Sequence, residues 1–422
     1  MQLKKFRIEG LFGTFTHTIR FPVPADQAAK PAVVILHGRN GIGKTTILRM
    51  LDGMMRLDFN TFRQVPFESC ALEFTSGAIS VQAEKKKSGL KSLFVTYGNV
   101  SARLHPKESG PLIPSELPRV EAFRNKFLKA SQELAFEFID TERLYRQRVD
   151  PGEEAALRGL SDHERAYLLA SSPPNPKARP TRARGTLSSR VEQFVREAQV
   201  NYRTFFATSE PDLFPKIIER LTTAEAAKYD IADLKRRLEH IHTADARTGS
   251  LGLESDPWDY RKLLLTLRSV GKRSGTAKAQ ALAVLTTYIE QLESRAAERG
   301  LLADRLLTFQ GLMSDFLADK KVTVGPKAGL VITGTSGSRL QETQLSSGEY
   351  HLLFLMVAAL VTKRLGTVIA IDEPEMSMHI AWQGKLIGAL VECASRAGPL
   401  FIFATHSPEL AASYPDGLVE LK

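Results

Sequence analysis

Residues 32–46 read AVVILHGRNGIGKTT, and this stretch decides the fold. Its first part, from Ala32 to Leu36, is a continuous aliphatic run, which is typical of a strand buried on both faces of a sheet. A glycine-rich turn follows, and the apolar spacing of ILRMLDGMM after the turn is helical. Strand, loop and helix therefore come in the order that a phosphate-binding loop requires.

The turn satisfies the pattern GxxxxGK[ST]. Glycines let the backbone wrap closely around a phosphate with its N–H groups pointing inward, and the helix N-terminus adds a partial positive charge. We expect Lys44 to bridge the β- and γ-phosphates and Thr45 to bind Mg²⁺. A chance glycine-rich turn is the alternative, and the flanking strand and helix argue against it. The predicted ATP-binding residues are Gly38, Asn40, Gly41, Gly43, Lys44, Thr45 and Thr46.

Two acidic residues, Asp372 and Glu373, follow the apolar run at 368–371 directly. The carboxyl end of a buried strand lies at the crevice where open α/β sheets bind ligands. We expect Asp372 to contribute to the magnesium site and Glu373 to act as the general base that polarises the attacking water. Strand-end acids that cap a helix are the alternative.

Two further motifs lie near the C-terminal end. LSSGE at 345–349 opens a predicted helix, whose start is itself an anion site, although a helix cap alone would explain the same residues. His406 ends another apolar strand, PLFIFAT, in the manner of Asp372. The motif order and spacing favour a shared site.

GRNGIGKT, LSSGE, IDEPE and ATHSP, in this order, resemble the ABC-type ATPase heads of the SMC, RecF and OLD-like superfamily. The resemblance implies an α/β fold, with a P-loop head of mixed sheet and flanking helices, in which two heads sandwich two ATP molecules. It implies that His406 reads the γ-phosphate and is catalytic beside Glu373. It also implies a signature that completes the facing head's site in trans, formed by Ser346, Ser347, Gly348 and Glu349.

GLFGTFTHTIRF, FIDTERL and IDEPEMSMHIAWQ are closer still to the ATPase subunits of the PARIS anti-phage systems, and more distantly to the Septu ATPases. This resemblance implies a nucleotide-dependent sensor that forms head-to-head dimers or higher homo-oligomers. Its implied partner is an effector, a Toprim-like nuclease, released by a phage-encoded trigger. The alternative is a RecF-like or SMC-like DNA-binding ATPase in repair; a transporter subunit is a third class, which the DEPEMSMH wording opposes.

Two positions depart from the superfamily pattern. Glu142 stands where related heads often have a glutamine, and His379 stands where transporter heads have an aspartate. The roles of both residues stay open.

The predicted organisation is a split head with an insertion. An N-terminal lobe at 1–170 is followed by a basic, proline-rich linker at 171–186, a helical arm at 187–300 and a C-terminal lobe at 301–422. Two leucine-rich stripes in the arm predict a short antiparallel coiled coil, with a bundle core as the alternative. The stripes are formed by Ile231, Leu234, Leu238 and Ile241, and by Leu282, Leu285, Ile289 and Leu292.

The composition is that of a globular protein, and its excess of basic residues favours acidic partners. The 422 residues include 57 basic and 47 acidic ones, for a net charge of +10. A basic segment, 177–190, keeps DNA open as a partner, with a solvated linker as the alternative. Two cysteines exclude a disulfide scaffold, and no apolar run is long enough to span a membrane. We therefore expect a cytoplasmic protein.

Overall fold

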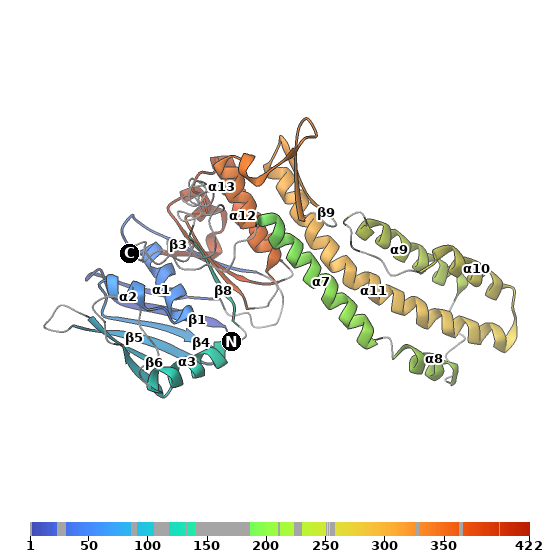
Figure 1. The fold of residues 1–422 in the computed structure, drawn as a ribbon, viewed down its shortest axis with the longest axis horizontal. Coiled ribbons are helices and arrows are strands. Elements are labelled where there is room, and N and C mark those ends of the chain that lie inside the picture. Colours follow the sequence, from blue (N-terminus) through green and yellow to red (C-terminus); the bar gives the residue numbers. More distant parts are fainter. Residues whose placement is uncertain are drawn as a thin grey trace, which may run out of the picture. The chain divides into compact units, whose positions relative to one another are not determined.

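The computed structural model describes most of the chain, with gaps. The described residues are 2–22, 31–85, 91–104, 118–131, 134–140, 186–209, 212–222, 230–249, 251, 253, 258–325, 329–362, 366–395 and 397–422. The chain divides into two compact units, Met1–Thr181 with Ser346–Lys422, and Arg182–Leu345 (Figure 1). Glu142, the predicted linker up to residue 185 and most of the basic segment 177–190 lie outside the described residues.

The first unit contains a five-stranded parallel sheet. Its strand order is β14-β3-β13-β12-β8, and all neighbours pair in parallel. Aliphatic and aromatic side chains bury both of its faces, which is typical of a parallel sheet. The strands predicted from 32–36, 368–371 and PLFIFAT are all confirmed. The strands are β3 (Ala32–His37), β8 (Phe136–Asp140), β12 (Val368–Asp372), β13 (Leu400–Thr405) and β14 (Leu418–Glu420).

A second sheet of the same unit is antiparallel and has six strands in the order β2-β1-β4-β5-β6-β7. Consecutive strands from β4 to β7 pair as hairpins and form a meander. The strands are β1 (Leu3–Leu11), β2 (Phe15–Arg20), β4 (Ser69–Phe74), β5 (Gly77–Lys85), β6 (Lys91–Tyr97) and β7 (Val100–Leu104).

Helix α1 (Lys44–Arg56) follows the glycine-rich loop and packs into one core with both sheets. Its buried side chains, such as Ile47 and Leu51, share a cluster with Phe6 of β1 and with Val34 of β3. Short helix α2 (Asn60–Gln64) and helix α3 (Pro118–Ser131) contribute Phe62 and Phe127 to this core. Burial of α1 therefore fixes the position of the loop at its N-terminus.

Three helices complete the unit after the second lobe begins: α12 (Ser347–Val361), α13 (Ile380–Cys393) and α14 (Pro408–Ser413). Helix α13 packs against both α12 and α14. Although α12 is strongly apolar, no helix among the described residues has the length and hydropathy that crossing a bilayer requires. The mixed α/β head with a phosphate loop agrees with the predicted fold class.

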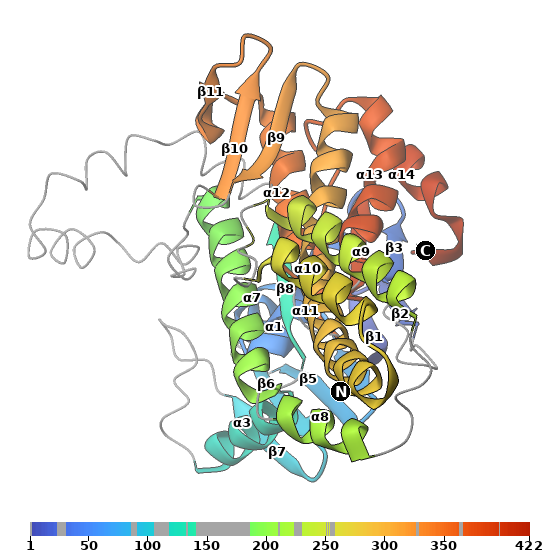
Figure 2. The ribbon, with the colours of Figure 1, turned by 90° about the vertical axis from the view of Figure 1, so that its right-hand side faces the viewer.

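The second unit is a helical arm with a small sheet at one end (Figure 2). Strands β9 (Lys320–Gly325) and β10 (Gly329–Gly334) form an antiparallel pair, and β11 (Arg339–Leu340) extends it. Helix α7 packs on β10, while α11 packs on β9. The helices are α7 (Leu187–Ser209), α8 (Leu213–Thr222), α9 (Ile231–Gly249), α10 (Tyr260–Gly271) and α11 (Gly275–Phe316).

The two leucine-rich stripes do pack into one cluster, but the predicted antiparallel pairing of these stripes is wrong. Ion pairs join Arg237 of α9 to Glu293 of α11, and Arg247 to Asp304, so residue numbers rise together and the helices run parallel. The reason is helix α10, which runs back between the end of α9 and the start of α11 and adds Leu267 and Val270 to the core. The stripes belong to a three-helix bundle.

The second unit also extends past the predicted end of the arm at residue 300. Helix α11 continues without a break to Phe316, and β9, β10 and β11 stay attached to α11 and α7. The buried face of α11 beyond residue 300 includes Leu306, Phe309 and Met313, which explains why the helix does not end there. The division into compact units ends the second unit at Leu345, the residue with which LSSGE begins.

Candidate functional site

The predicted phosphate loop is pre-shaped for an anion. Gly41 and Gly43 have φ values of 81° and 103°, in the left-handed region that glycine tolerates best. Gly43 is the N-cap of α1, and it leaves the first amides of the helix without a side-chain acceptor; no acidic residue lies in the first turn. These amides and the helix dipole favour a negatively charged ligand.

Lys44 is buried at the start of α1, with 5% of its surface exposed. Its Nζ donates to the Gly38 and Arg39 carbonyls at 2.7 and 3.1 Å, and lies 3.0 Å from His406 Nδ1. Burial lowers the pKa of Lys44, while Glu373 and Asp372 act in the opposite direction. The Lys44 ammonium group therefore bonds to the carbonyls of its own loop and lies near acidic side chains.

Thr45 connects the loop to the next functional strand. Its hydroxyl donates to Asp372 Oδ1 at 2.9 Å, across 327 residues of sequence. Asp372 is 7% exposed, and its pKa rises to about 7; burial is the largest cause, Glu373 and Asp140 add to the rise, and the bond from Thr45 and the charge of Arg49 oppose it. A carboxyl in this state favours a cation beside it, because a cation stabilises the charged form.

Glu373 and His406 face each other in the same site as Thr45 and Asp372. Glu373 has φ of 48°, which is uncommon for a residue with a side chain and marks local strain. Its Oε1 lies 3.3 Å from His406 Nε2, and the other ring nitrogen of His406 meets Lys44. The structure thus brings these residues together in two sets of contacts, Lys44 with His406 and Glu373, and Thr45 with Asp372.

Glu375 was not identified from the sequence as a site residue, although IDEPE contains it. Its Oε1 accepts from the Thr405 hydroxyl at 2.5 Å and from the backbone amides of His406 and Ser407 at 3.0 and 3.1 Å. A carboxylate that accepts several donors fixes their backbone. Glu375 therefore holds the segment that presents His406.

Asp140 was also missed, because FEFID was interpreted only as a core strand. Parallel pairing of β8 with β12 sets Asp140 directly beside Asp372. Arg49 of α1 donates to Asp140 at 3.3 Å. An acid at a strand's end, as in IDE, was the available signal. The sheet edge thus concentrates three carboxylates, Asp140, Asp372 and Glu373.

His17 supports the loop from below and carried no sequence signal. It lies on β2, is 3% exposed, and its Nε2 donates to the Ile42 carbonyl at 3.2 Å. Burial lowers the pKa of His17, so the neutral ring is favoured. The hairpin of β1 and β2 also brings Leu11 against Gly43 so closely that a side chain at Gly43 would collide with it.

The LSSGE residues form a separate group at the start of α12. Ser346 is the N-cap: its hydroxyl accepts from Glu349 N at 3.3 Å, and the Glu349 carboxylate accepts from Ser346 N at 2.7 Å. Gly348 is buried against the Ser377 carbonyl, where a Cβ would collide. Ser347 begins the helix. The motif is thus a capping box packed on the turn that follows Asp372 and Glu373.

His379 acts as a structural cap. Its Nδ1 accepts from Ala381 N at 3.2 Å, which makes it the N-cap of α13. His351 of α12 is buried nearby and its Nδ1 lies 3.0 Å from the Met376 carbonyl. Both histidines therefore order the turn between β12 and α13.

Residues 33–412 match the protein family described as "AAA domain, putative AbiEii toxin, Type IV TA system". The chain belongs to this family. An AAA-type ATPase domain agrees with the phosphate loop, the strand-end acids and the shape of the sheet. The match runs through the inserted arm, so head and arm together are the AAA domain of this family.

Similar solved structures are SMC head domains. One is the Smc head with an extended coiled coil bound to the C-terminal domain of ScpA from Pyrococcus furiosus, with 13% identity over 98% of this chain and 91% of that chain, and a TM-score of 0.35. An SmcHead bound to the C-winged helix domain of ScpA has 11% identity over 98% and 92%, with a TM-score of 0.40. The SMC head domain from Thermotoga maritima has 11% identity over 98% and 92%, with a TM-score of 0.34. No curated protein sequence matches this chain.

Proposed function

We propose that this protein binds and hydrolyses ATP with the aid of Mg²⁺. The observation that carries the proposal is that the start of α1 meets the strand-end residues twice, through Thr45 to Asp372 and through Lys44 to His406, which in turn meets Glu373. The loop amides and Lys44 bind the phosphates, aided by Gly38, Asn40, Gly41, Gly43 and Thr46. Lys44 leaves the Gly38 and Arg39 carbonyls to reach the β- and γ-phosphates.

Thr45 and Asp372 are the residues that would hold the magnesium ion. They fit it, because a buried carboxyl with a raised pKa and an adjacent hydroxyl form an oxygen donor set of the kind Mg²⁺ uses beside phosphates. The bound ion would neutralise charge on the β- and γ-phosphate oxygens. Its charge would also counter the crowding of carboxylates at this edge.

Glu373 is the proposed general base, since its carboxylate stands at the strand end and faces His406 beside the phosphate loop. It takes a proton from the attacking water, and the broken bond leaves ADP and phosphate. His406, held by Glu375, is placed to contact the γ-phosphate region and to report whether it is occupied. Hydrolysis would therefore change the contacts of the segment after β13, which carries His406.

We extend the proposal to two heads acting together. The superfamily resemblance gives Ser346, Ser347, Gly348 and Glu349 a role in trans, and the exposed, capped start of α12 suits a phosphate that arrives from another copy. A γ-phosphate bonded by both heads favours the closed form, because a ligand shifts an equilibrium through differential contacts. ATP would thus control association.

The use of this cycle, in our proposal, is to regulate an effector protein in bacterial anti-phage defence. The resemblance to PARIS ATPases suggests a Toprim-like nuclease as effector and a phage-encoded trigger. The alternative is a RecF-like or SMC-like ATPase in DNA repair. Nuclease release after ATP turnover would favour the first.

The enzymatic proposal is tested by two substitutions with different expected defects. Lys44→Ala should abolish nucleotide binding, whereas Glu373→Gln should bind ATP and hydrolyse it about 100-fold or more slowly. Equilibrium binding of a fluorescent ATP analogue and phosphate release separate the two. Hydrolysis by Glu373→Gln at the wild-type rate would exclude the assignment of Glu373.

A further inference from the structure

The second unit carries a surface that the ATPase proposal does not use. Residues 260–289 include six Lys and Arg residues and no Asp or Glu. Five of these basic residues are exposed on α10 and on the turn after it, and the sixth is half-buried at the start of α11. We call these six residues the α10 basic face: Arg261, Lys262, Arg268, Lys272, Arg273 and Lys278.

The α10 basic face differs from the other cations of the same arm in its pairing. Arg236, Arg237 and Arg247 on α9 each meet a carboxylate. By contrast, none of the six basic-face residues has an ion pair within the described ranges of the chain. Six cations that meet no carboxylate among the described residues attract a polyanion, and the attraction gains from released counterions.

The helix orders these cations along a line. Arg261, Arg268 and Lys272 share one side of α10 with Leu265, since their spacing is seven and four residues. At the helical rise the gaps are about 10 Å and about 6 Å. Leu265 is 63% exposed between them, which offers an apolar contact in the middle of a charged row. A chain of phosphates with apolar groups between them matches this row.

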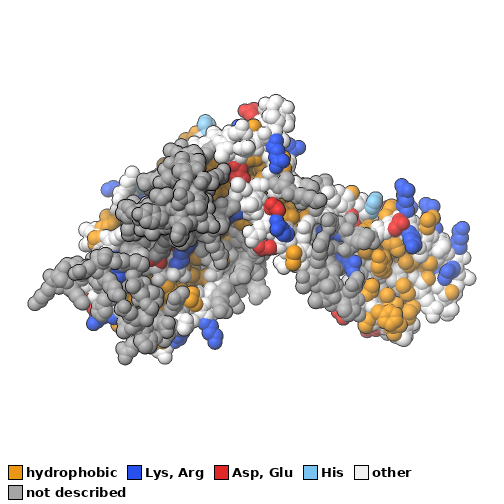
Figure 3. Space-filling view, in the orientation of Figure 1, with side chains coloured by type: hydrophobic (Ala, Val, Ile, Leu, Met, Phe, Trp, Pro, Cys, Tyr) orange, Lys and Arg blue, Asp and Glu red, His pale blue; other side chains and the backbone are white. Residues whose placement is uncertain are grey.

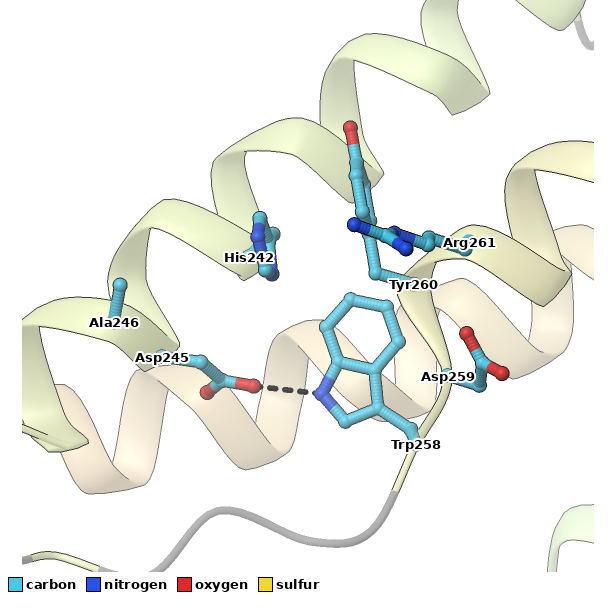
Figure 4. A pocket seen from close by; sticks show the side chains of 7 residues that line it. All are labelled: His242, Asp245, Ala246, Trp258, Asp259, Tyr260 and Arg261. Carbon is cyan, nitrogen blue, oxygen red and sulfur yellow. Dashed lines mark hydrogen bonds between the residues drawn. The ribbon is translucent and has the colours of Figure 1, made fainter.

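A cavity lined by aromatic rings lies at the N-terminal end of this row (Figure 4). Its volume is about 570 Å³, and Arg261 is one of its walls. The rings of His242 and Tyr260 are stacked with centroids 4.3 Å apart, and Trp258 stands perpendicular to both. His242 is exposed, so one face of this aromatic stack is open to a planar group.

The acidic walls of the cavity are already engaged by donors. Asp245 receives Trp258 Nε1 at 2.6 Å and pairs with Arg299, and the Asp259 carboxylate accepts from Lys262 N at 3.0 Å. These carboxylates therefore serve the fold. With Arg261 as the exposed cation at the rim, the cavity suits a nucleobase better than a cationic group.

We infer that α10 and the adjoining cavity form a binding surface for single-stranded nucleic acid. The basic face binds the phosphates and the ring of His242 stacks on a base, a combination that single-strand binding proteins use. Figure 3 shows Lys and Arg side chains projecting from this end of the second unit. A duplex would place phosphates on the row but no base in the cavity.

The test measures binding of fluorescein-labelled oligothymidylate to the full chain over a range of salt concentrations. Arg268→Ser/Lys272→Ser/Arg273→Ser should weaken binding about tenfold at low salt and flatten the slope of log K against log salt by about 2. The matched control is Arg196→Ser/Lys235→Ser/Arg236→Ser, which removes the same charge from cations that have carboxylate partners. The control should keep the wild-type slope.

Two further measurements separate the source of the binding. His242→Ala should weaken oligothymidylate binding about tenfold and leave duplex binding unchanged. Polyglutamate should compete poorly with oligothymidylate for binding to the protein. If the triple variant unfolds early, Arg268→Ser alone should flatten the slope by about 0.7.

The inference is overturned by any of three results. The basic-face and control variants could lose affinity equally, or polyglutamate could compete as well as oligothymidylate, which would indicate an acidic protein partner. The third is an unchanged affinity of His242→Ala for the single strand, which would leave the cavity without a role. Because ATP plays no part in this assay, its outcome is independent of the proposed hydrolysis.

Discussion

Two buried carboxyl groups, Asp372 in the first unit and Asp245 in the second, have nearly equal exposure but opposite surroundings. Asp245 is 9% exposed and is compensated within the chain by Arg299 and by the Trp258 ring N–H. Asp372 is 7% exposed and shares its strand edge with two other acids, so its pKa rises to about 7. A compensated buried charge stabilises a fold, whereas a crowded one prepares for a cation.

The largest effect is expected when the ion pair between Asp245 and Arg299 is broken. Arg299→Met should leave Asp245 buried without its cation and destabilise the arm by about 3–5 kcal/mol, because an isolated buried charge is costly. The double variant Arg299→Met/Asp245→Leu should recover most of that loss. Chemical denaturation monitored by Trp258 fluorescence measures it. A stability loss below about 1 kcal/mol for Arg299→Met would place Asp245 in the same class as Asp372.

The next largest effect concerns the signature helix. Ser346→Arg should lower the hydrolysis rate about 100-fold while single-head ATP binding stays near the wild-type level, since bulk and charge would block a facing site. Ser346→Ala is the comparison variant, because it removes the hydroxyl and the helix cap, worth about 1 kcal/mol, without adding bulk or charge. Steady-state rates and light scattering with ATP and with ADP compare the variants. Equal rates for Ser346→Arg and wild type would refute a role in trans.

A smaller effect is expected below the phosphate loop. His17→Leu removes the donor to the Ile42 carbonyl and should weaken ATP binding about tenfold, because a buried carbonyl left without its donor costs about 1–3 kcal/mol. His17→Gln restores a nitrogen donor and should recover most of the affinity. Isothermal titration gives both values. If the two variants bind alike, the contact only packs the hairpin.

The local motifs were predictable because they are contiguous in sequence. Strand, glycine turn and helix at 32–56 need no long-range information, and the strand-end positions of Asp372 and His406 follow from apolar runs. Side chains that hold these groups were not predictable. His17 meets Ile42, and Glu375 meets residues 405–407, through tertiary packing that no periodicity encodes.

The arm shows the same limit for helix direction. Heptad-like spacing identified which faces of α9 and α11 are buried, and the cluster contains every predicted leucine. Direction depends on how many helices lie between the two stripes, and α10 was not predicted as a helix of its own. Periodicity reports a buried face and not its partner.

The central claim is that burial and neighbouring carboxylates at the sheet edge raise the pKa of Asp372 to about 7, so that its charged form favours a cation beside it. It is tested most directly by the unfolding free energy of wild type and Asp372→Asn against pH, without nucleotide or Mg²⁺. A carboxyl whose pKa rises from 3.8 to about 7 on folding loses its stabilising contribution as pH rises through that window. Asp372→Asn should therefore be more stable than wild type at pH 8, by at most about 4 kcal/mol, with a smaller difference at pH 5. If Asp372→Asn is instead the less stable protein at both pH values, Asp372 is compensated as Asp245 is, and the account is wrong.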